Sequence, residues 1–281
     1  MNFPSPANLK QLPEEVQIAL EAARRGGEVL QRFWQQLQAE QIKEKGKGDL
    51  VTAADLASEQ AVTEFLSREM PEAAIVSEEG TARSGSGTVW YIDPLDGTTN
   101  FVQRFPVFAV SIGLAETSDR SNASLLAGVV YNPATGELFY GAKNHGSFLN
   151  EQRLKVSTKT ELHDAVIATG FPRRYHEEFD PYLKEFRALF PKCRAIRRAG
   201  AAALDLCWTA QGIFDGFWEH KLSPWDVAAG ALIVQEAGGL CTDFDGELRF
   251  LHNGNVIGAS PVLHRQLIQT IREAQSDSGP I

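Results

Sequence analysis

Residues 90–101, WYIDPLDGTTNF, constrain the fold of this chain more than any other stretch. The apolar run over residues 88–92 predicts a strand, and Asp93 and Asp96 follow it in a Pro-containing turn. Gly97 then precedes a Thr-Thr-Asn segment that can open a helix. We therefore expect two carboxylates at the exit of a strand, next to the start of a helix.

A strand end next to a helix start can bind a cation and an anion side by side. Asp93 and Asp96 are three residues apart, so both side chains can converge on one hard cation, with the carbonyl oxygen of Leu95 as a further ligand. The backbone amides of Gly97 and Thr98 can face an anion at the helix N-terminus. A plain turn capped by Asp side chains explains the same residues without a metal, and this stretch alone does not decide between the two.

Other carboxylates of the chain also stand where a strand ends or a helix begins. These carboxylates lie in residues 48–55 (GDLVTAAD), 77–80 (SEEG) and 225–239 (WDVAAGALIVQEAGG). A further segment, residues 104–113 (RFPVFAVSIG), carries no carboxylate and is mostly apolar. Together with residues 90–101, in this order and spacing, these segments resemble the inositol monophosphatase family of Mg²⁺-dependent, Li⁺-sensitive phosphatases.

The resemblance extends over nearly the whole chain and implies its architecture. The family's fold is of the α/β class, a layered αβαβα sandwich of the sugar-phosphatase type. We expect one domain over residues 1–281, with two closely packed halves over approximately 1–160 and 161–281. The resemblance also implies a homodimer.

A metal site for two or three Mg²⁺ ions is also implied by the resemblance. Its ligands would be Glu78, Asp93, the carbonyl of Leu95, Asp96 and Asp226. Asp55 and Thr98 would orient the attacking water, and Glu78 would take part in catalysis with them. Contacts to the substrate are implied for Gly97, Thr98, Gly200, Ala201, Ala202, Glu219 and Asp226.

The reaction expected of such a site is hydrolysis of a small phosphate monoester by in-line attack of a metal-activated water, without a covalent intermediate. Residues 99–101 resemble the inositol monophosphatase branch, so inositol 1-phosphate is the expected substrate. Ala201 and residues 221–224 (KLSP) depart from animal members at the rim that contacts the alcohol. Fructose 1,6-bisphosphate, histidinol phosphate and other sugar or nucleotide phosphates therefore remain open.

Several of these residues also have a purely structural explanation. Asp55 and Thr52 fit a capping box, and Asp226 is placed as the N-cap of a long apolar helix. Glu219 can be a surface charge at the end of its strand. Residues 200–202 can be small simply because they pack tightly.

Glu78 and Glu79 are adjacent acidic residues after a short apolar strand. On an extended chain, neighbouring side chains point to opposite sides, so only one of the two can readily serve a given metal. By resemblance Glu78 is the ligand and Glu79 supports it. Two solvated charges in a loop are the alternative.

Hydrophobic periodicity and turn residues place the other elements. Helices are predicted at residues 13–37, 53–68, 180–189, 201–211, 227–237 and 261–273. Strands are predicted at residues 74–77, 88–92, 105–116, 125–131, 138–143, 165–169, 193–198, 214–219, 240–244 and 256–259, with a hairpin over 146–156. Residues 42–48 and 81–87 are predicted to be loops, and Gly26 and Gly27 predict a close crossing of the first helix.

The composition is that of a globular protein, with 281 residues of which 43% are hydrophobic and 22% charged. The net charge of −9 disfavours nucleic-acid binding as the main function. No apolar run reaches about 18 residues, so we expect no membrane span and a cytoplasmic location. Cys193, Cys207 and Cys241 are widely spaced and are predicted to be buried free thiols.

A role as a binding partner is the alternative from another class of function. At least one bacterial member of the resembling family serves a transcription complex. The candidate contact patch in this chain is basic and consists of Arg173, Arg174, Arg194, Arg197 and Arg198. The acidic chain and the complete set of expected metal ligands favour catalysis as the principal role.

Overall fold

The computed structural model describes residues 3–4, 12–46, 49–116, 124–172 and 176–276. Its α-helices are α1 (Glu14–Phe33), α2 (Ala53–Glu69), α3 (Thr98–Val102), α4 (Phe179–Leu189), α5 (Ala202–Gln211), α6 (Pro224–Glu236), α7 (Phe250–Asn253) and α8 (Pro261–Ser276). Short 3-10 helices lie at Ala39–Gln41, Leu162–Asp164 and His176–Glu178.

The described strands form a hairpin and two sheets. The hairpin pairs β1 (Ile42–Gly46) with β2 (Asp49–Thr52). The larger sheet contains β3 (Ala74–Ser77), β4 (Ala82–Arg83), β5 (Thr88–Asp96), β6 (Ala109–Glu116), β7 (Leu125–Asn132), β8 (Glu137–Ala142), β9 (Gly146–Leu149) and β10 (Gln152–Arg153). The smaller sheet contains β11 (Val166–Thr169), β12 (Ala195–Arg197), β13 (Gly216–Glu219), β14 (Leu240–Thr242) and β15 (Val256–Ala259).

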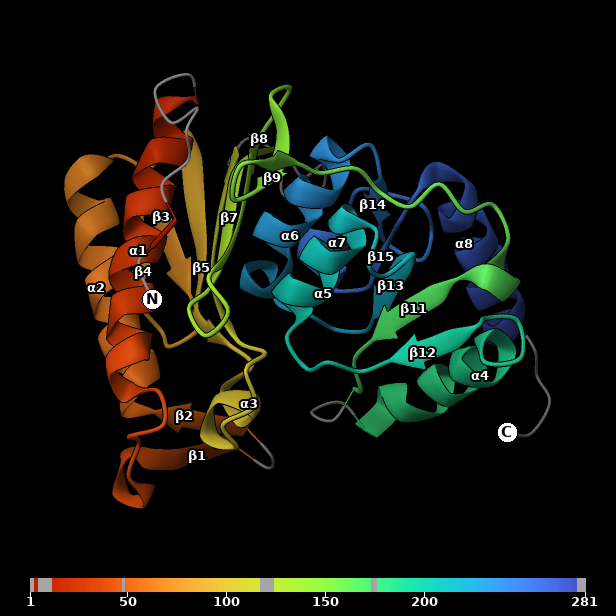
Figure 1. Cartoon of the computed structure of the whole chain (residues 1–281), viewed down its shortest axis with the longest axis horizontal. Coiled ribbons are helices and arrows are strands. Elements are labelled where there is room, and N and C mark those ends of the chain that lie inside the picture. Colours follow the sequence, from red (N-terminus) through yellow and green to blue (C-terminus); the bar gives the residue numbers. More distant parts are fainter. Residues whose placement is uncertain (1–2, 5–11, 47–48, 117–123, 173–175, 277–281) are drawn as a thin grey trace.

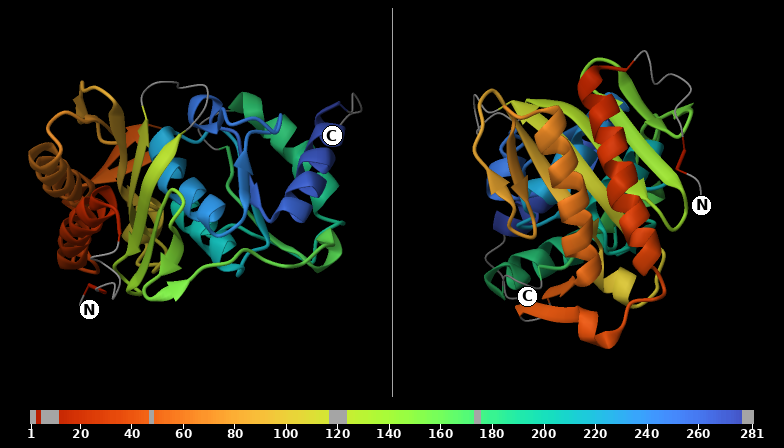
Figure 2. Two further views of the ribbon diagram at one scale, coloured as in Figure 1. Left: turned by 90° about the horizontal axis from the view of Figure 1, so that it is seen from above. Right: turned by 90° about the vertical axis from the view of Figure 1, so that its left-hand side faces the viewer.

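These elements stack in five layers, which Figures 1 and 2 show from three directions. Helices α1 and α2 cover the outer face of the larger sheet, and α5 and α6 lie between the two sheets. Helices α4 and α8 cover the outer face of the smaller sheet. The predicted αβαβα sandwich is thus confirmed.

The larger sheet has the strand order β10-β9-β8-β7-β6-β5-β3-β4 and is antiparallel except where β3 runs parallel to β5. Its faces are apolar on both sides, because one face packs on α1 and α2 and the other on α6. The smaller sheet, β12-β11-β13-β15-β14, combines parallel and antiparallel pairs. The antiparallel first half and the α/β second half match the sequence pattern.

Two glycines bring α6 unusually close to the larger sheet. A Cβ atom added at Gly113 would lie 2.7 Å from the Cβ of Ala228, and one at Gly128 would lie 2.7 Å from the carbonyl oxygen of Ala229. Because neither glycine has a side chain, the helix backbone packs directly on β6 and β7. This packing brings the N-terminal turn of α6 to the end of β5.

The predicted crossing at Gly26 and Gly27 is confirmed. A Cβ atom at Gly26 would meet Ser58 and Val62 of α2 at 2.9 Å, and one at Gly27 would meet the ring of Tyr131 at 2.3 Å.

Helix α1 ends at Phe33, short of the predicted residue 37. The reason is tertiary packing.

The chain turns out of the helix at Trp34, whose ring lies 4.5 Å from that of Phe108 and 5.4 Å from that of Phe101. These are distances at which aromatic rings attract one another. The indole therefore packs on the residues that follow the end of β5.

Two predicted loops contain strands. Within the segment predicted as a loop at residues 42–48, Ile42–Gly46 forms β1, which pairs with β2, although its side chains after Ile42 are polar and do not alternate. The strand forms because its backbone pairs with β2, and the polarity of the sequence does not indicate that pairing. Within residues 81–87, β4 pairs with β3, and Arg83 donates hydrogen bonds to the carbonyl oxygens of Ala73 and Met70.

The strand predicted at residues 105–116 begins only at Ala109, and α6 begins three residues before the predicted residue 227. The other boundaries agree within about three residues, and α7 was not predicted. Cys207 and Cys241 are buried free thiols as predicted, whereas Cys193 is only partly buried. In the described residues, no helix is both long and apolar enough to span a membrane. The division of the chain near residue 160 stays a prediction.

Candidate active site

A polar cleft with a volume of about 200 Å³ opens where β5, α3, α5, β13 and the start of α6 meet. The predicted site residues that line it are Glu78, Asp93, Leu95, Asp96, Gly97, Thr98, Gly200, Ala201, Ala202, Glu219 and Asp226. Asp55 lies behind this surface, in contact with Thr98. The structure therefore brings all the predicted site residues together, although Asp55 and Asp226 are 171 residues apart in the sequence.

Strand β5 continues through the residues that the sequence predicted as a turn. Asp93 is paired with Ser111 and Asp96 with Ala109, so β5 has one residue more than β6 between these two pairs. This β-bulge accommodates Pro94, which has no amide to donate to a neighbouring strand. The predicted turn is thus wrong in form, but both carboxylates still line the cleft.

Gly97 ends the strand in a left-handed conformation, with φ of 87°, and is the N-cap of α3. A Cβ atom there would lie 2.8 Å from the carbonyl oxygen of Val107, so glycine suits both the backbone angle and the space. The Asn100 side chain donates hydrogen bonds to the carbonyl oxygens of Ala199 and Gly200, at 3.0 and 3.3 Å. Asn100 thereby joins α3 to the segment that precedes α5.

Two of the carboxylates accept hydrogen bonds from backbone amides near helix N-termini. Asp96 Oδ2 accepts from the amide of Ala203 in the first turn of α5, at 2.8 Å. Asp226 Oδ2 accepts from the amide of Ser223, the N-cap of α6, at 2.7 Å. The prediction that Asp226 itself is the N-cap is wrong, because α6 starts at Pro224 and Asp226 is the third residue of the helix.

The carboxylates raise one another's pKa values. Burial, followed by the charges of Glu78, Asp96 and Asp226, raises the pKa of Asp93 well above its usual range. Burial, with the charges of Glu78 and Asp96, does the same for Asp226. Burial raises the pKa of Asp96 to about 7, although the Ala203 amide opposes the shift. Such a cluster needs a cation if all its members are to be ionised together.

The chemistry of this donor set fits Mg²⁺. Its groups are oxygen donors only, which is what hard divalent cations prefer. So many buried carboxylates could not all be ionised without a cation to compensate their charge. In the part of the chain that the structure describes, no three His, Cys, Asp or Glu side chains are already arranged to hold a metal ion. Binding would therefore require the carboxylates to turn toward the ion.

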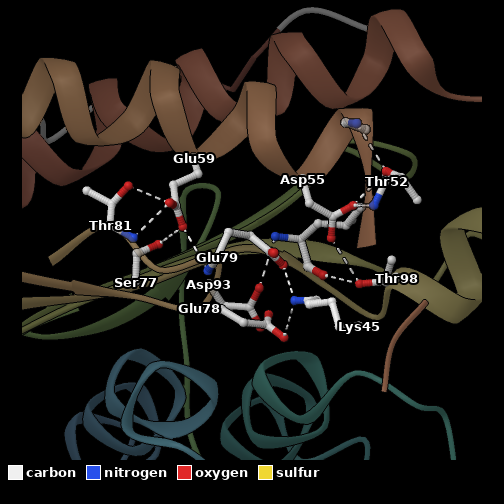
Figure 3. Close-up of polar contacts among 12 residues, drawn as sticks. Lys45, Thr52, Asp55, Glu59, Ser77, Glu78, Glu79, Thr81, Asp93 and Thr98 are labelled. Carbon is white, nitrogen blue, oxygen red and sulfur yellow. Dashed lines mark hydrogen bonds and ion pairs between the residues drawn. The ribbon is translucent and has the colours of Figure 1, made fainter. Parts of the chain in front are cut away.

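Lys45 of β1 lies at the edge of the cluster (Figure 3). Its ammonium nitrogen is 3.4 Å from Glu78 Oε1 and also contacts Glu79 Oε1. Glu78 and Glu79 follow β3 in a turn, so the expectation that they point to opposite sides is wrong: both reach the same lysine. Burial raises the pKa of Glu79 to about 7, against the opposing effect of Lys45.

Asp55 caps α2 and also contacts Thr98 (Figure 3). Its Oδ2 accepts hydrogen bonds from the amide and the hydroxyl of Thr52, at 2.8 and 2.6 Å, which confirms the capping box of α2. Its Oδ1 accepts from the Thr98 hydroxyl at 3.1 Å. The same hydroxyl is 3.2 Å from the carbonyl oxygen of Leu95. Burial raises the pKa of Asp55 to about 6.

On the opposite wall, Glu219 ends β13 and is half-buried, so the surface-charge explanation is wrong. Its carboxylate packs over Gly170, where an added Cβ atom would lie 1.8 Å from Glu219 Oε1. Burial raises the pKa of Glu219 to about 8, and the charge of Arg198 opposes that shift. A protonated carboxyl at this place can both donate and accept a hydrogen bond.

His220 and Lys221 follow Glu219 and tie it to the outer helix layer. His220 Nε2 is 2.7 Å from Glu185 Oε2, and both side chains are buried. Lys221 Nζ is 3.2 Å from Glu178 Oε1, and its backbone is left-handed with φ of 52°. This wall of the cleft is thus held by α4 and the residues just before it.

Sequence reasoning missed Lys45, Glu59, Asp205 and His220 near the site. Glu59 lies four residues after Asp55 on the same helix face, a spacing that could have indicated it. Lys45 is one of three lysines in a polar segment, and only the β1–β2 pairing shows which one reaches the cleft. Asp205 and His220 carry no local signal, because their surroundings come from distant segments.

The predicted basic patch is only partly described. Arg173 and Arg174 lie outside the described residues. Arg194 and Arg197 are exposed at the edge strand β12 and its approach, and Arg194 is paired with Asp164 at 2.5 Å. Arg198 lines the cleft and lies 5.4 Å from the ring centre of Phe171, so it belongs to the cleft wall.

A layered α/β sandwich with a buried carboxylate cluster at a strand end and a Thr–Asp pair beside it has groups suited to metal-assisted hydrolysis of a phosphate ester. The sequence model of the inositol monophosphatase family matches residues 12–276, and this chain belongs to that family. The family comprises phosphatases of small-molecule phosphate esters and is in general Mg²⁺-dependent.

Individual relatives match over nearly their whole length. The chain is 43% identical to "Nus factor SuhB" of Pseudomonas aeruginosa over 261 residues, which are 91% of this chain and 94% of that one. It is 39% identical to "Inositol-1-monophosphatase" of Mesorhizobium japonicum, over 92% and 96% of the two chains. The crystal structure of the extragenic suppressor protein suhB from Bartonella henselae is similar with a TM-score of 0.86, at 37% identity, over 93% and 99%.

Proposed function

We propose that this chain is a Mg²⁺-dependent phosphatase that hydrolyses inositol monophosphates to inositol and phosphate. The observation that carries the proposal is the contact between Thr98 and Asp55 at the edge of the carboxylate cluster. It places a hydroxyl, backed by a buried carboxylate, beside the groups suited to a hard cation. The family, whose members are phosphatases, supports the reaction class.

The proposed metal ligands are Glu78, Asp93, the carbonyl oxygen of Leu95, Asp96 and Asp226. When bound there, Mg²⁺ would supply an activated water and neutralise charge on the phosphate and the leaving oxygen. The amides that hold Asp96 and Asp226 keep one oxygen of each carboxylate fixed, so that the other is left to turn into the cleft. Each helix N-terminus also favours the ionised form of its carboxylate.

Thr98 and Asp55 would handle the proton of the attacking water. The Thr98 hydroxyl donates to Asp55 Oδ1, so the lone pairs on Thr98 Oγ1 can accept a hydrogen bond from water. As the water attacks phosphorus, its proton passes to Thr98 Oγ1 and the Thr98 proton passes to Asp55 Oδ1. A pKa of about 6 for Asp55 places this base close to the operating range of a general base.

Glu219 would contact the alcohol part of the substrate. It faces the cluster across the cleft, and with a pKa of about 8 it is protonated near neutral pH, so that it can bind a hydroxyl as donor and as acceptor. A polyol such as inositol presents the hydroxyls that this wall requires. The name of the Mesorhizobium japonicum relative supports the same substrate.

The test is phosphate release in Mg²⁺ from a panel of esters: inositol 1-phosphate, fructose 1,6-bisphosphate, histidinol phosphate and adenosine 3′,5′-bisphosphate. We expect the highest kcat/KM for inositol 1-phosphate. Preference for another member of the panel would leave the metal chemistry in place and reassign the substrate. Absence of turnover with every ester would overturn the enzymatic proposal.

A second candidate function is supported by the name "Nus factor SuhB", which the Pseudomonas aeruginosa relative carries. Arg194 and Arg197 near the edge strand β12 would be part of the contact surface for a transcription complex. An Asp93→Asn variant that still binds RNA polymerase complexes would support this role independently of catalysis. Absence of binding by the wild-type protein would dismiss it.

A further inference from the structure

Glu59, which the proposed function does not use, lies between α2 and the turn that carries Glu78 (Figure 3). It projects from α2, and only 5% of the residue is exposed. Its Oε2 accepts hydrogen bonds from the Ser77 hydroxyl and, at 2.9 Å, from the amide of Glu79. Its Oε1 accepts from the amide of Thr81 at 3.1 Å and from the Thr81 hydroxyl.

All four of these donors belong to residues 77–81, the turn between β3 and β4. The turn is also closed by a backbone hydrogen bond from Ser77 to Thr81, at 3.1 Å, and the amide of Glu78 donates to the carbonyl oxygen of Ile92 on β5, at 3.1 Å. Glu78 therefore sits in a segment whose flanking residues are fixed on one side by Glu59 and on the other by β5.

The donors require a carboxylate. A glutamine at this position would replace one oxygen by an NH₂ group, which cannot accept a hydrogen bond from the donors that face it. At least one donor pair would then be left buried and unsatisfied, at a cost of about 1–3 kcal/mol for each group. Burial alone does not explain why four donors of one turn converge on a single side chain.

We propose that Glu59 is a positioning residue that sets the direction of Glu78 for metal binding. It touches neither substrate nor metal; it fixes the backbone on both sides of the ligand. Because α2 also carries Asp55, one helix then aims both the proposed base and the proposed metal ligand. This inference rests on the proposed function, since it requires Glu78 to be a metal ligand.

The matched control is Asp215, a second buried carboxylate that organises a turn. It is 1% exposed and accepts hydrogen bonds from the Ser157 hydroxyl, at 2.5 Å, from Lys159 Nζ, at 2.8 Å, and from the amide of Val166, at 2.7 Å. Asp215 precedes β13, whereas Glu219 ends that strand, so the control lies at the end of β13 away from the cleft. Asp215→Asn removes comparable contacts without touching the cluster.

The experiment is a titration with Mg²⁺, followed by the rise in melting temperature of the wild type, Glu59→Gln and Asp215→Asn. Both variants are expected to melt below the wild type in EDTA. The dissociation constant for Mg²⁺ that fits this rise, called the Mg²⁺ midpoint below, should increase by about 10- to 100-fold in Glu59→Gln, the usual effect of removing a group that orients a ligand. Asp215→Asn should keep the wild-type midpoint.

Two milder variants test the same inference if Glu59→Gln does not fold. Thr81→Val removes one of the four donors and should raise the Mg²⁺ midpoint by several-fold, whereas Thr81→Ser keeps the hydroxyl and should restore it. Wild-type midpoints in both Glu59→Gln and Thr81→Val would overturn the inference and leave the proposed function intact. A wild-type protein whose melting temperature does not respond to Mg²⁺ would overturn both.

Discussion

The two walls of the cleft are built in different ways. On the side of the larger sheet, Asp93 and Asp96 lie within four residues of each other, and Asp55 is placed by a capping box that spans residues 52–55. On the side of the smaller sheet, Glu219 is held by contacts from Gly170 and through His220 and Lys221 by residues near α4. Local geometry places most of the first wall, to which distant residues add the Ala203 amide on Asp96 and the Thr98 hydroxyl on Asp55. The second wall depends on tertiary contacts throughout.

This difference suggests a division of work. The first wall holds most of the proposed metal ligands and the proton acceptor, which any phosphate ester would need, and Asp226 in the first turn of α6 completes the ligand set. The second wall contacts the part of the substrate that differs from one ester to another. Changes in the first wall should therefore affect all substrates alike, and changes in the second should alter the choice among them.

The largest expected effect comes from Asp93→Asn. Loss of one carboxylate from the cluster should lower phosphate release by roughly 10³-fold for every ester, because a metal supplies several kcal/mol of transition-state stabilisation. It should also abolish the rise in melting temperature with Mg²⁺. Asp245→Asn, at an exposed position, is the control for the same chemical change. Activity near the wild-type level would contradict a metal role for Asp93.

The next effect concerns stability of the second wall. His220→Leu leaves Glu185 as a buried carboxylate without its imidazole partner, and we expect a loss of about 3–5 kcal/mol in the free energy of unfolding, measured with urea. Adding Glu185→Leu should restore much of that loss. The Mg²⁺ midpoint should not change in either variant. A marked change would show that the second wall also affects metal binding.

Substrate choice should respond to Glu219→Leu. The leucine side chain can neither donate nor accept a hydrogen bond, so we expect KM for inositol 1-phosphate to rise by about 10- to 100-fold with little change in kcat. The kcat/KM for p-nitrophenyl phosphate, which has no polyol, should change by less than about threefold. An equal loss of kcat/KM for both esters would show that Glu219 does not contact the alcohol part of the substrate.

The pH dependence of Mg²⁺ stabilisation gives a smaller effect. In the metal-free protein the pKa of Asp96 is about 7, above its ordinary value of 3.8, so the folded protein retains protons that the unfolded chain has lost. Stability without metal should therefore fall as pH rises toward 7. The Mg²⁺ midpoint should decrease by roughly tenfold per pH unit for each proton displaced, between about pH 5 and 7. A midpoint independent of pH would contradict binding at this cluster.

Much of the first wall could be predicted from the sequence, because strand ends, capping boxes and glycines leave local signals. Asp55, Asp93 and Gly97 lie where those signals place them. The bulge at Pro94 could not be predicted, since it depends on pairing with β6. Glu59 was missed because its four donors come from a turn about 20 residues farther along the chain.

The second wall was beyond local reasoning. Glu219 was identified only through resemblance, and nothing in the residues around it indicates the buried pair of His220 with Glu185, which lies 35 residues earlier. The positions of most helices followed from hydrophobic periodicity, and their layered arrangement followed from the family resemblance. Which polar side chains meet between those layers depends on their packing, which periodicity does not specify.

The central claim is that the carboxylate cluster is a Mg²⁺ site that hydrolyses a phosphate ester. Its most direct test is phosphate release from inositol 1-phosphate by the wild type as Mg²⁺ is added back to metal-free protein. We predict no release in EDTA, a saturable rise with Mg²⁺, and a melting temperature that rises over the same concentration range. Equal release with and without Mg²⁺ would contradict the account.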